Sequence, residues 1–437
     1  MSQPRSQRTG GTDGAAPSDQ PSDQPSDQPS DQPVAPGDLR RAGHFGAEAF
    51  LAVGLALVVI VALSTHLLSP WSGYPVAPLH FPGSWVLEGW VRYDGGWYRD
   101  IVDHGYAYAG PRTQSNVAYF PGYPMVMSGV TDVVRNSVLA GILLTAASGL
   151  GAAVLFARWA RARLDDRTAR LAVLLLLLYP FAWYLFGAVY ADAFFLVAAI
   201  GAFVLLEGGH PVLAGLVGAM ATASRPIGPA LVLGLVLVVI ERRGGFRQLR
   251  ALRLEDFGVL LSAAGTVGWS IYQGIRWGDP LLFAHIEDAD GWNQGMGPRT
   301  WFKATFLWRV RELPGWLSDS IHHTTQHSSR PWTESTITMS LMLQAACLLV
   351  ACLLVRTVWR RFGWGYGGYV VAVIAIGALG TKDFLSVGRY LLAAFPLFAA
   401  AAVVLADRPR TRVATLIGSG AVLALLASGY ARGYYLA

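Results

Sequence analysis

The chain has 437 residues, of which 53% are hydrophobic and only 14% are charged, and its mean hydropathy is +0.39. This composition excludes an ordinary soluble domain. The formal net charge of +6 does not favour nucleic-acid binding, because the arginines stand in short segments between apolar stretches. We therefore expect an all-α polytopic membrane protein that contacts membrane lipids and has no nucleic-acid partner.

The first 45 residues differ in kind from the rest. Four tandem Ser-Asp-Gln-Pro repeats run from Ser18 to Pro33. Polar sequence of this type cannot bury enough apolar surface to offset the entropy of the chain. We expect residues 1–45 to be a disordered cytoplasmic tail and residues 46–437 to be a transmembrane domain. No cleavable signal peptide is expected, because the first apolar segment is long and internal.

After this tail, about eleven segments approach the length and apolarity needed to cross a bilayer as a helix. The expected spans are 48–68, 137–157, 169–187, 190–207, 211–224, 226–240, 256–275, 337–356, 366–381, 387–406 and 412–430. Arginine clusters supply their orientation, because Lys and Arg accumulate in short cytoplasmic loops. The clusters lie at 40–41, 158–170, 242–253, 356–361 and 408–412. An arrangement of about eleven helices places all five clusters and the N-terminus in the cytoplasm.

This arrangement requires that residues 118–134 do not cross the membrane. Pro121, Gly122 and Pro124 favour an interfacial or re-entrant piece there. The large outer loops are then 69–136 and 276–336. We expect a multi-pass protein of the cell membrane whose unusual polar residues, and hence its active site, lie on the extracytoplasmic face.

Asp94 is the leading candidate for catalysis. It stands in an aromatic and glycine-containing stretch that runs from Arg92 to Tyr98. Aromatic rings stack on sugars and glycine allows close backbone approach, so a carboxylate here is a candidate base for lipid-linked sugar chemistry at a membrane surface. The alternative is a structural cap or turn residue.

Other polar residues on the same face allow two interpretations each. Asp192 is either a substrate ligand or a common helix N-cap before an apolar run. Arg225, between two apolar spans, either binds phosphate or pairs with Asp192. Lys382 and Arg389 share one outer turn and suit an anionic phosphate, or they anchor the protein to lipid head groups.

No cofactor is expected. His322, His323 and His327 could present imidazoles to a metal, but no nearby Glu completes a known motif, so a divalent metal is not indicated. Cys347 and Cys352 lie in one apolar run and are interpreted as small core residues. Glycine-rich phosphate loops, a GxGxxG fingerprint after a strand and hydrolase elbows do not occur in the sequence. An activated sugar is therefore not expected to be carried on a nucleotide.

Taken in order, these motifs resemble the class V phosphatidylinositol-glycan family, which comprises the second-mannose transferases of GPI-anchor synthesis and bacterial relatives with a GT-C membrane fold. The segments that carry the resemblance are Tyr93-Asp94, Trp97-Tyr98, Ile101, Gly105-Tyr106, Tyr119-Phe120-Pro121-Gly122-Tyr123-Pro124, Tyr190-Ala191-Asp192, Ser224-Arg225-Pro226-Ile227-Gly228, Trp277-Gly278-Asp279-Pro280-Leu281-Leu282-Phe283 and Gly388-Arg389-Tyr390. The chain departs from the family pattern at Tyr93, where the family has Trp, at Asp192, where it has Glu, and at Ile227, where Asn is frequent. Asp192 is shorter than Glu by one methylene, so its role is less well supported than that of Asp94.

The resemblance implies a GT-C-like bundle that transfers mannose from a polyprenyl-phosphate donor to a lipid or glycan acceptor on the outer face. Asp94 would deprotonate the acceptor hydroxyl. Arg389 and Lys382 would hold the donor phosphate, with electrostatic support from Arg225. The other expected substrate-binding residues are Trp97, Tyr98, Tyr106, Asp192 and Tyr390. Two alternatives remain open: a non-enzymatic carrier or flippase of lipid-linked sugars, which needs cationic sites but no base, and a transferase for another sugar.

Overall fold

The computed structural model describes residues 34–71, 84–294, 297–322 and 330–436, and all regular secondary structure in these ranges is helical. In chain order the helices are α1 (Pro36–Leu67), α2 (Trp85–Glu88), α3 (Asp94–His104), η1 (Asn116–Ala118), α4 (Gly122–Val134), α5 (Ser137–Arg161), α6 (Asp166–Leu177), η2 (Ala182–Leu185), α7 (Asp192–Glu207), α8 (Pro211–Thr222), α9 (Gly228–Arg242), η3 (Phe246–Ala251), η4 (Leu254–Ala263), α10 (Ala264–Trp277), α11 (Leu282–His285), η5 (Ile286–Asp288), α12 (Pro298–Trp301), α13 (Ala304–His322), α14 (Arg330–Phe362), α15 (Trp364–Gly380), α16 (Val387–Ala393), α17 (Pro396–Leu405) and α18 (Pro409–Ala431), where η marks a 3-10 helix. The expected all-α class is confirmed for this part of the chain. Residues from Val34 onward form one compact unit.

Apolar helices make this a multi-pass membrane protein. Within the described ranges, four helices are long and apolar enough to cross a membrane, namely α1, α5, α14 and α18. A fifth crossing is formed if α16 and α17, which are bent by 89° at their junction, count as one span. Shorter or interrupted helices occupy the other expected spans. The expected number of about eleven crossings therefore stays a prediction.

Apart from the bend within 387–406, the helices differ clearly from the expected segments in three places. Helix α1 begins at Pro36, ten residues before the expected start of the transmembrane domain, with proline in its first turn and the acidic Asp38 near the positive end of the helix dipole. The segment 169–187 is broken, because α6 ends at Leu177 and only the short η2 follows. The segment 256–275 changes from 3-10 to α-helix at Ala264.

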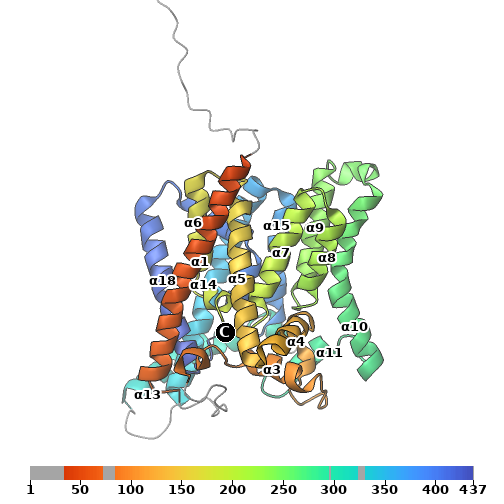
Figure 1. Cartoon of the computed structure of the whole chain (residues 1–437). Helices are drawn as coiled ribbons and strands as arrows, with labels where there is room; N and C mark the ends of the chain where they lie inside the picture. Colours follow the sequence, from red (N-terminus) through yellow and green to blue (C-terminus); the bar gives the residue numbers. More distant parts are fainter. Residues whose placement is uncertain (1–33, 72–83, 295–296, 323–329, 437) are drawn as a thin grey trace, which may run out of the picture. The chain divides into compact units, whose positions relative to one another are not determined.

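Small residues let the helices approach closely. A Cβ atom on Gly149 of α5 would lie 1.9 Å from the Leu185 carbonyl oxygen. A Cβ atom on Gly46 of α1 would lie 2.7 Å from the Ala153 carbonyl oxygen of α5. Glycine at such contacts is typical of helix packing in membranes, where no hydrophobic effect drives association. Helix α5 consequently packs closely against α1 and η2, and it also lies beside α7 (Figure 1).

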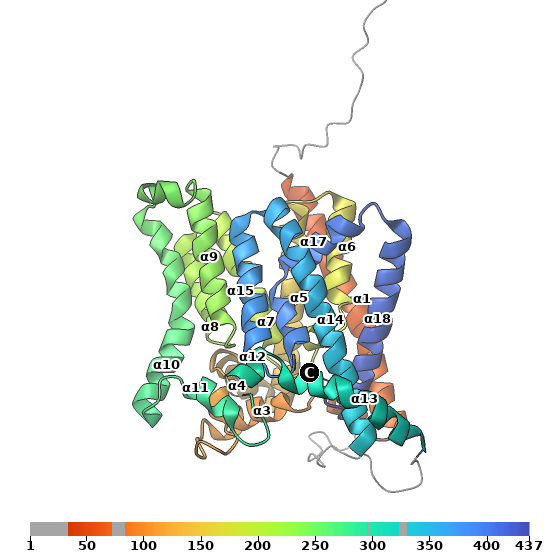
Figure 2. The same ribbon diagram turned by 180° about the vertical axis from the view of Figure 1, so that it is seen from behind.

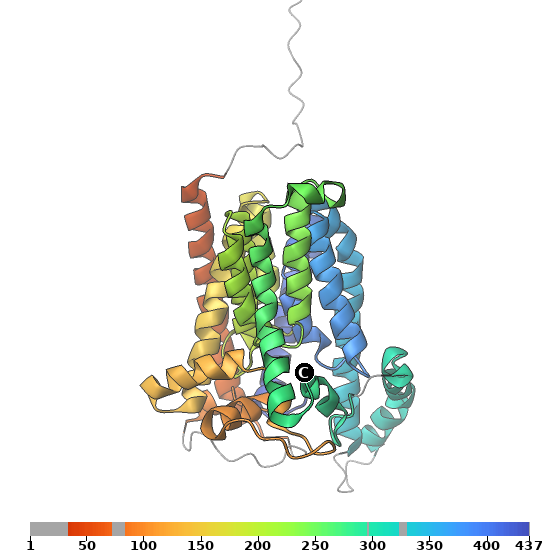
Figure 3. The same cartoon turned by 90° about the vertical axis from the view of Figure 1, so that its right-hand side faces the viewer.

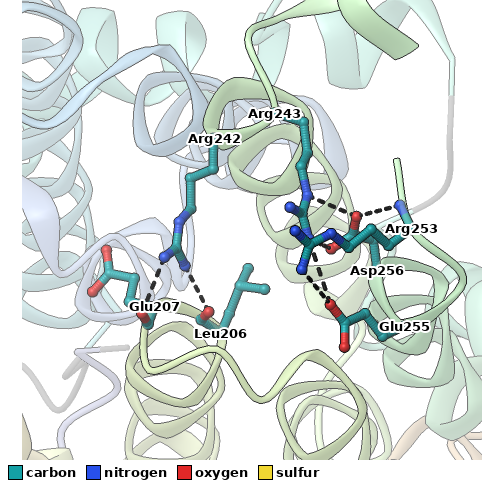
Figure 4. Close-up of polar contacts among 7 residues, drawn as sticks. All are labelled: Leu206, Glu207, Arg242, Arg243, Arg253, Glu255 and Asp256. Carbon is teal, nitrogen blue, oxygen red and sulfur yellow. Dashed lines mark hydrogen bonds and ion pairs between the residues drawn. The ribbon is translucent and has the colours of Figure 1, made fainter. Parts of the chain in front are cut away.

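One end of the bundle is tied together by arginines. Arg243 donates from Nε and Nη2 to the Asp256 carboxylate, both at 2.8 Å, and so joins α9 to η4 (Figure 4). Arg242 donates to the carbonyl oxygens of Leu206 and Glu207 at 2.6 and 3.1 Å, and so satisfies the C-terminal carbonyls of α7. The arginine cluster at 242–253 thus has structural partners, and its role in orientation stays a prediction.

The other end carries the short helices of the predicted outer loops. Helices α3, α4 and α11 lie there beside the start of α7 (Figure 1), and α12 and α13 lie at the same end when the molecule is seen from behind (Figure 2). The side view shows the orange and teal segments together at this end (Figure 3). Which end faces the cytoplasm, and whether α4 stays out of the membrane, remain predictions.

Candidate active site

The candidate site is built around the first turn of α3. Asp94 is the first residue of this helix, and the preceding Tyr93 has a positive φ of 51°. Such a backbone conformation is unfavourable for a bulky residue and must be held by contacts. The Tyr93 hydroxyl donates to the Gly433 carbonyl oxygen, and Arg92 donates to that of Ala431 at 2.8 and 3.2 Å. The end of α18 therefore fixes the position of Asp94.

The Asp94 carboxylate accepts from two donors that are distant in sequence. Its Oδ1 accepts from the Tyr119 hydroxyl at 3.1 Å, and its Oδ2 accepts from Arg389 Nη1 at 2.8 Å. Burial and the Asp94 charge raise the pKa of Tyr119 well above its usual value, so this hydroxyl stays protonated and can donate. The Asp94 and Arg389 side chains are 23% and 13% exposed, so their ion pair is better shielded from solvent than a surface pair.

Arg389 lies among tyrosine rings. Its guanidinium carbon is 5.1 Å from the ring centre of Tyr190, 5.8 Å from that of Tyr184 and 5.9 Å from that of Tyr390, within the range of cation–π attraction. Nη2 donates to Ser386 Oγ at 3.3 Å. The buried Nε has no hydrogen-bond partner in the described part of the chain. A positioned guanidinium with an unused donor is suited to hold a further anion.

Aromatic rings line the surroundings of Asp94. The Trp97 ring stacks on Tyr119 at 6.1 Å and meets Trp292 edge-on at 5.9 Å, and it remains half-buried. Tyr98 is buried between Tyr119 and Tyr123, with ring centres 5.2 and 5.0 Å away. Of the predicted stacking residues, Trp97 is therefore the more accessible to a ligand.

Tyr106 is linked to Asp94 indirectly, through Tyr119. Its ring packs on Trp269 of α10 at 4.6 Å, and its hydroxyl donates to the Tyr119 carbonyl oxygen at 3.0 Å. Through this contact Tyr106 positions Tyr119, which in turn donates to Asp94. The predicted contact of Tyr106 with sugar or lipid is not apparent from this geometry and stays a prediction.

Asp192 and Arg225 form a buried ion pair. Arg225 Nη1 donates to Asp192 Oδ1, and the Arg225 and Asp192 side chains are 6% and 2% exposed, respectively. Of the two interpretations open for Arg225, the structure shows the pairing with Asp192. The pair adjoins the Asp94 site, because the Arg225 guanidinium also lies 4.8 Å from the ring centre of Tyr390. Tyr390 is thus close to both Arg225 and Arg389.

The two lysines of the chain meet at the turn before α16. Lys303 Nζ donates to the Thr381 carbonyl oxygen, and Lys382 Nζ donates to that of Trp292 at 2.8 Å. Burial lowers the pKa of Lys382, and it lowers that of Lys303 to about 8, although Asp383 opposes both shifts. Lys382 therefore anchors the loop that carries Trp292, and its role as a phosphate ligand stays a prediction.

No family model matches this chain, and no curated protein matches it. Among solved structures, the chain is similar to ArnT from Cupriavidus metallidurans bound to undecaprenyl phosphate, with 19% identity and a TM-score of 0.46 over 84% of this chain and 62% of that chain. It is also similar to the apo oligosaccharyltransferase from Archaeoglobus fulgidus, with 12% identity and a TM-score of 0.42 over 88% of this chain and 56% of that chain. The chain thus spans less than two thirds of the length of these proteins. At this level of similarity they carry no argument about its site or its reaction.

A cavity of about 460 Å³ lies at the arginine-rich end and not near Asp94. The residues that line it include Arg163, Glu207 and Arg242. Arg163 pairs with Glu207, and Arg242 is bonded to carbonyl oxygens, so this cavity offers no free base among these residues. The described residues contain no group of three or more metal-binding side chains. His323, His327 and the side chain of His322 lie outside the described part.

Four residues near Asp94 were not singled out from the sequence as parts of a site. Glu287 and Trp292 come from the second predicted outer loop, and Tyr119 and Tyr190 come from motifs that were noted only for their order. An acidic residue in a polar loop has no local pattern that marks it as functional. The Tyr119 motif was the one available signal, because its two prolines and its aromatic pair stand next to a membrane span.

Proposed function

We propose that this protein is a membrane glycosyltransferase that moves a mannosyl residue from a polyprenyl-phosphate donor to a hydroxyl of a lipid or glycan acceptor on the extracytoplasmic face. The observation that supports this best is the contact of Asp94 with Arg389 at 2.8 Å. A group that can take a proton and a group that can hold a phosphate meet among aromatic rings at one end of a membrane bundle. Mannose and the polyprenyl carrier rest on the motif resemblance.

Donor binding would change the partner of Arg389. In the structure Asp94 Oδ2 accepts a hydrogen bond from Nη1 of the guanidinium, while Nε has no partner in the described part of the chain. The phosphodiester of the donor can accept two parallel hydrogen bonds from the guanidinium, whereas Asp94 accepts only the one from Nη1. Arg389 would therefore turn toward the donor phosphate, and Asp94 would keep only its bond from Tyr119. The base becomes available when the donor is in place.

In the transfer step, the proton, the new bond and the leaving group are all accounted for by the acceptor, the donor and these side chains. The acceptor oxygen attacks the anomeric carbon, and its proton passes to Asp94. The bond between the anomeric carbon and the phosphate oxygen breaks, and its electron pair stays on the phosphate. Arg389 stabilises the additional negative charge on this leaving group, and Lys382 would add a second positive charge. Attack and departure on opposite faces of the sugar invert the anomeric configuration.

The test uses the purified full chain in detergent with radiolabelled polyprenyl-phosphate mannose, a membrane lipid extract as acceptor and no nucleotide sugar. We expect label to move from the donor into a new product. Asp94→Asn should lower the rate by at least about a hundredfold, because it removes the base at nearly constant volume. The matched control is Asp103→Asn in the same helix, whose carboxylate pairs with Arg99 at 3.1 Å on the surface. This variant should transfer at close to the normal rate.

Two results would overturn the proposal. Near-normal transfer by a folded Asp94→Asn protein would remove the base assignment. Movement of the lipid-linked sugar across vesicle membranes without any new product, in wild type and Asp94→Asn alike, would identify a carrier. If label moves only from a donor with another sugar, the enzyme class stands and the mannosyl assignment is wrong.

A further inference from the structure

The loop that follows α10 is held against the Asp94 site. Ile286 and Ala289 are each only 1% exposed and pack with Val117 and Ala118 in a small apolar cluster separate from the main core. Buried Gln273 reinforces this contact, because its Nε2 donates to the Val117 carbonyl oxygen at 2.8 Å. The loop therefore has a defined position although most of it is irregular.

Glu287 lies in this loop between the two anchoring residues and is half-buried. The charged groups that act on its carboxyl are Asp94 of α3 and Arg389 of α16. Its side chain makes no hydrogen bond or ion pair within the described part of the chain. By contrast, both carboxylate oxygens of Asp94 already accept hydrogen bonds. Glu287 is thus a second carboxylate facing the same site, and its acceptor capacity is unused.

Trp292 supplies an aromatic ring from the same loop. Its ring meets Trp97 at 5.9 Å and Tyr119 at 6.3 Å, so it stands directly beside the Asp94 site. The loop is tied to the turn before α16, since Lys382 donates from Nζ to the Trp292 carbonyl oxygen at 2.8 Å and from its backbone nitrogen to Gln294 Oε1 at 2.9 Å. The carboxylate and the ring are therefore held at fixed positions next to the proposed phosphate ligands.

A free carboxylate next to an aromatic face is suited to bind a sugar ring. The apolar face of a pyranose packs on an aromatic ring, and its hydroxyls donate to a carboxylate through charge-assisted hydrogen bonds. We propose that Glu287 and Trp292 form the subsite that recognises the sugar of the donor, in which Glu287 accepts from two adjacent ring hydroxyls and Trp292 covers one face of the ring. This inference rests on the proposed function and adds its specificity-determining residues.

The charge of Glu287 gives this subsite a pH dependence. Burial and the Asp94 carboxylate raise the pKa of Glu287 to about 7, although Arg389 opposes the shift. The tyrosines that also face Glu287, Tyr119 and Tyr435, have raised pKa values and stay neutral in this range. Protonated Glu287 has less capacity to accept from two hydroxyls. Affinity for the sugar should therefore fall as the pH is lowered through about 7.

The experiment measures binding, so that it does not depend on turnover. Dissociation constants are determined for the full chain in detergent with polyprenyl phosphate alone and with the same lipid carrying mannose, glucose, galactose or arabinose. We expect at least one sugar to tighten binding by roughly 10- to 100-fold, as one or two charge-assisted hydrogen bonds allow. Glu287→Gln and Trp292→Ala should remove most of this gain without weakening the binding of the bare lipid phosphate.

The control is Asp290→Asn in the same loop, since Asp290 is 69% exposed in its side chain and lies 3.5 Å from Arg112 on the surface. The Asp290→Asn variant should keep the full gain in affinity that the sugar provides. Deoxy analogues of the preferred sugar test the subsite in the wild type without any substitution: loss of either of two adjacent hydroxyls should cost about tenfold or more in affinity. In Glu287→Gln, these losses of affinity for the deoxy sugars should be smaller. In the wild type, the gain in affinity that the sugar provides should decrease below pH 7.

The proposal is overturned if no sugar tightens binding, if the gain persists in both variants, or if single deoxy analogues bind as well as the parent. Equal loss of turnover by Glu287→Gln for every donor, with unchanged binding, would place Glu287 in the transfer step instead. Failure of the proposed function has a different signature. In that case sugar-dependent binding is present, but wild type and Asp94→Asn yield no transfer product.

Discussion

At the scale of the residue, the proposed reaction depends on whether Arg389 pairs with Asp94 or with the donor phosphate. The structure pairs it with Asp94, whereas the sequence suggested that it binds phosphate. Both statements hold if the arginine exchanges its partner when the donor binds. The exchange requires a guanidinium, because a lysine ammonium cannot contact a phosphate through two parallel hydrogen bonds or pack in the same way on the rings of Tyr184 and Tyr190.

Arg389→Lys should therefore impair transfer even though the charge is kept. We expect a loss of about tenfold or more in kcat/KM for the donor, corresponding to a charge-assisted hydrogen bond. Arg410→Lys serves as the control, because Arg410 is an exposed residue at the start of α18. Equal and mild effects of the two substitutions would favour an anchoring role for Arg389 at lipid head groups.

At the scale of the element, the Asp192–Arg225 pair joins the start of α7 to the turn between α8 and α9. Both side chains are almost fully buried. Removal of one partner leaves an unpaired charge in a medium of low dielectric constant, which costs about 3–5 kcal/mol. Replacement of both partners by apolar residues avoids this penalty and is often nearly neutral.

This difference separates a structural pair from a substrate ligand. We expect Asp192→Leu and Arg225→Met each to lower the thermal unfolding midpoint in detergent, while the double variant recovers most of the loss. If the pair is structural, the double variant should also keep substantial transfer activity. A stable double variant with no measurable transfer would show that Asp192 or Arg225 acts on the substrate.

The element scale also shows what positions Asp94. Tyr93 adopts its unfavourable backbone conformation because the end of α18 accepts hydrogen bonds from Tyr93 and Arg92. The site therefore combines a short helix that follows α1 with the last helix of the chain. Such a junction depends on how the whole bundle packs.

At the scale of the whole molecule, the testable feature is which end faces outward. The positive-inside rule places the arginine-rich end in the cytoplasm and the Asp94 end outside. Gly96 is exposed, and a Cβ atom there would have no neighbour within 4 Å, so it accepts a cysteine readily. Arg247 is exposed near the arginine-rich end.

In a background in which Cys347 and Cys352 are replaced by alanine, we expect Gly96→Cys to react with an impermeant thiol reagent added to intact cells. Arg247→Cys should react only after the membrane is opened. The reverse pattern would show that the molecule has the opposite orientation. Labelling of both sites from outside would show that an even number of crossings separates them, as expected if 118–134 also crosses the membrane.

The sequence alone determined the membrane class, the all-helical fold and most of the helical segments. These properties follow from local composition, because a helix satisfies its own backbone hydrogen bonds and its apolar length decides whether it can cross a bilayer. The break in 169–187, the change of helix type in 256–275 and the bend in 387–406 were not predicted from the sequence. Pro180 stands near the first break, but membrane helices tolerate proline and glycine, so such residues within an apolar stretch do not by themselves mark a helix end.

The tertiary structure alone decided which polar residues meet. Asp94 and Arg389 are separated by 295 positions in the chain, and no periodicity links them. The sequence allowed two partners for Arg225, a phosphate or Asp192. Packing of α7 against α8 places Arg225 beside Asp192. Glu287 and Trp292 lie near the Asp94 site because Ile286 and Ala289 are buried against Val117 and Ala118 and Lys382 holds the end of the loop. Hydropathy and propensity act over a few residues, whereas a site depends on close packing between elements that are distant in sequence.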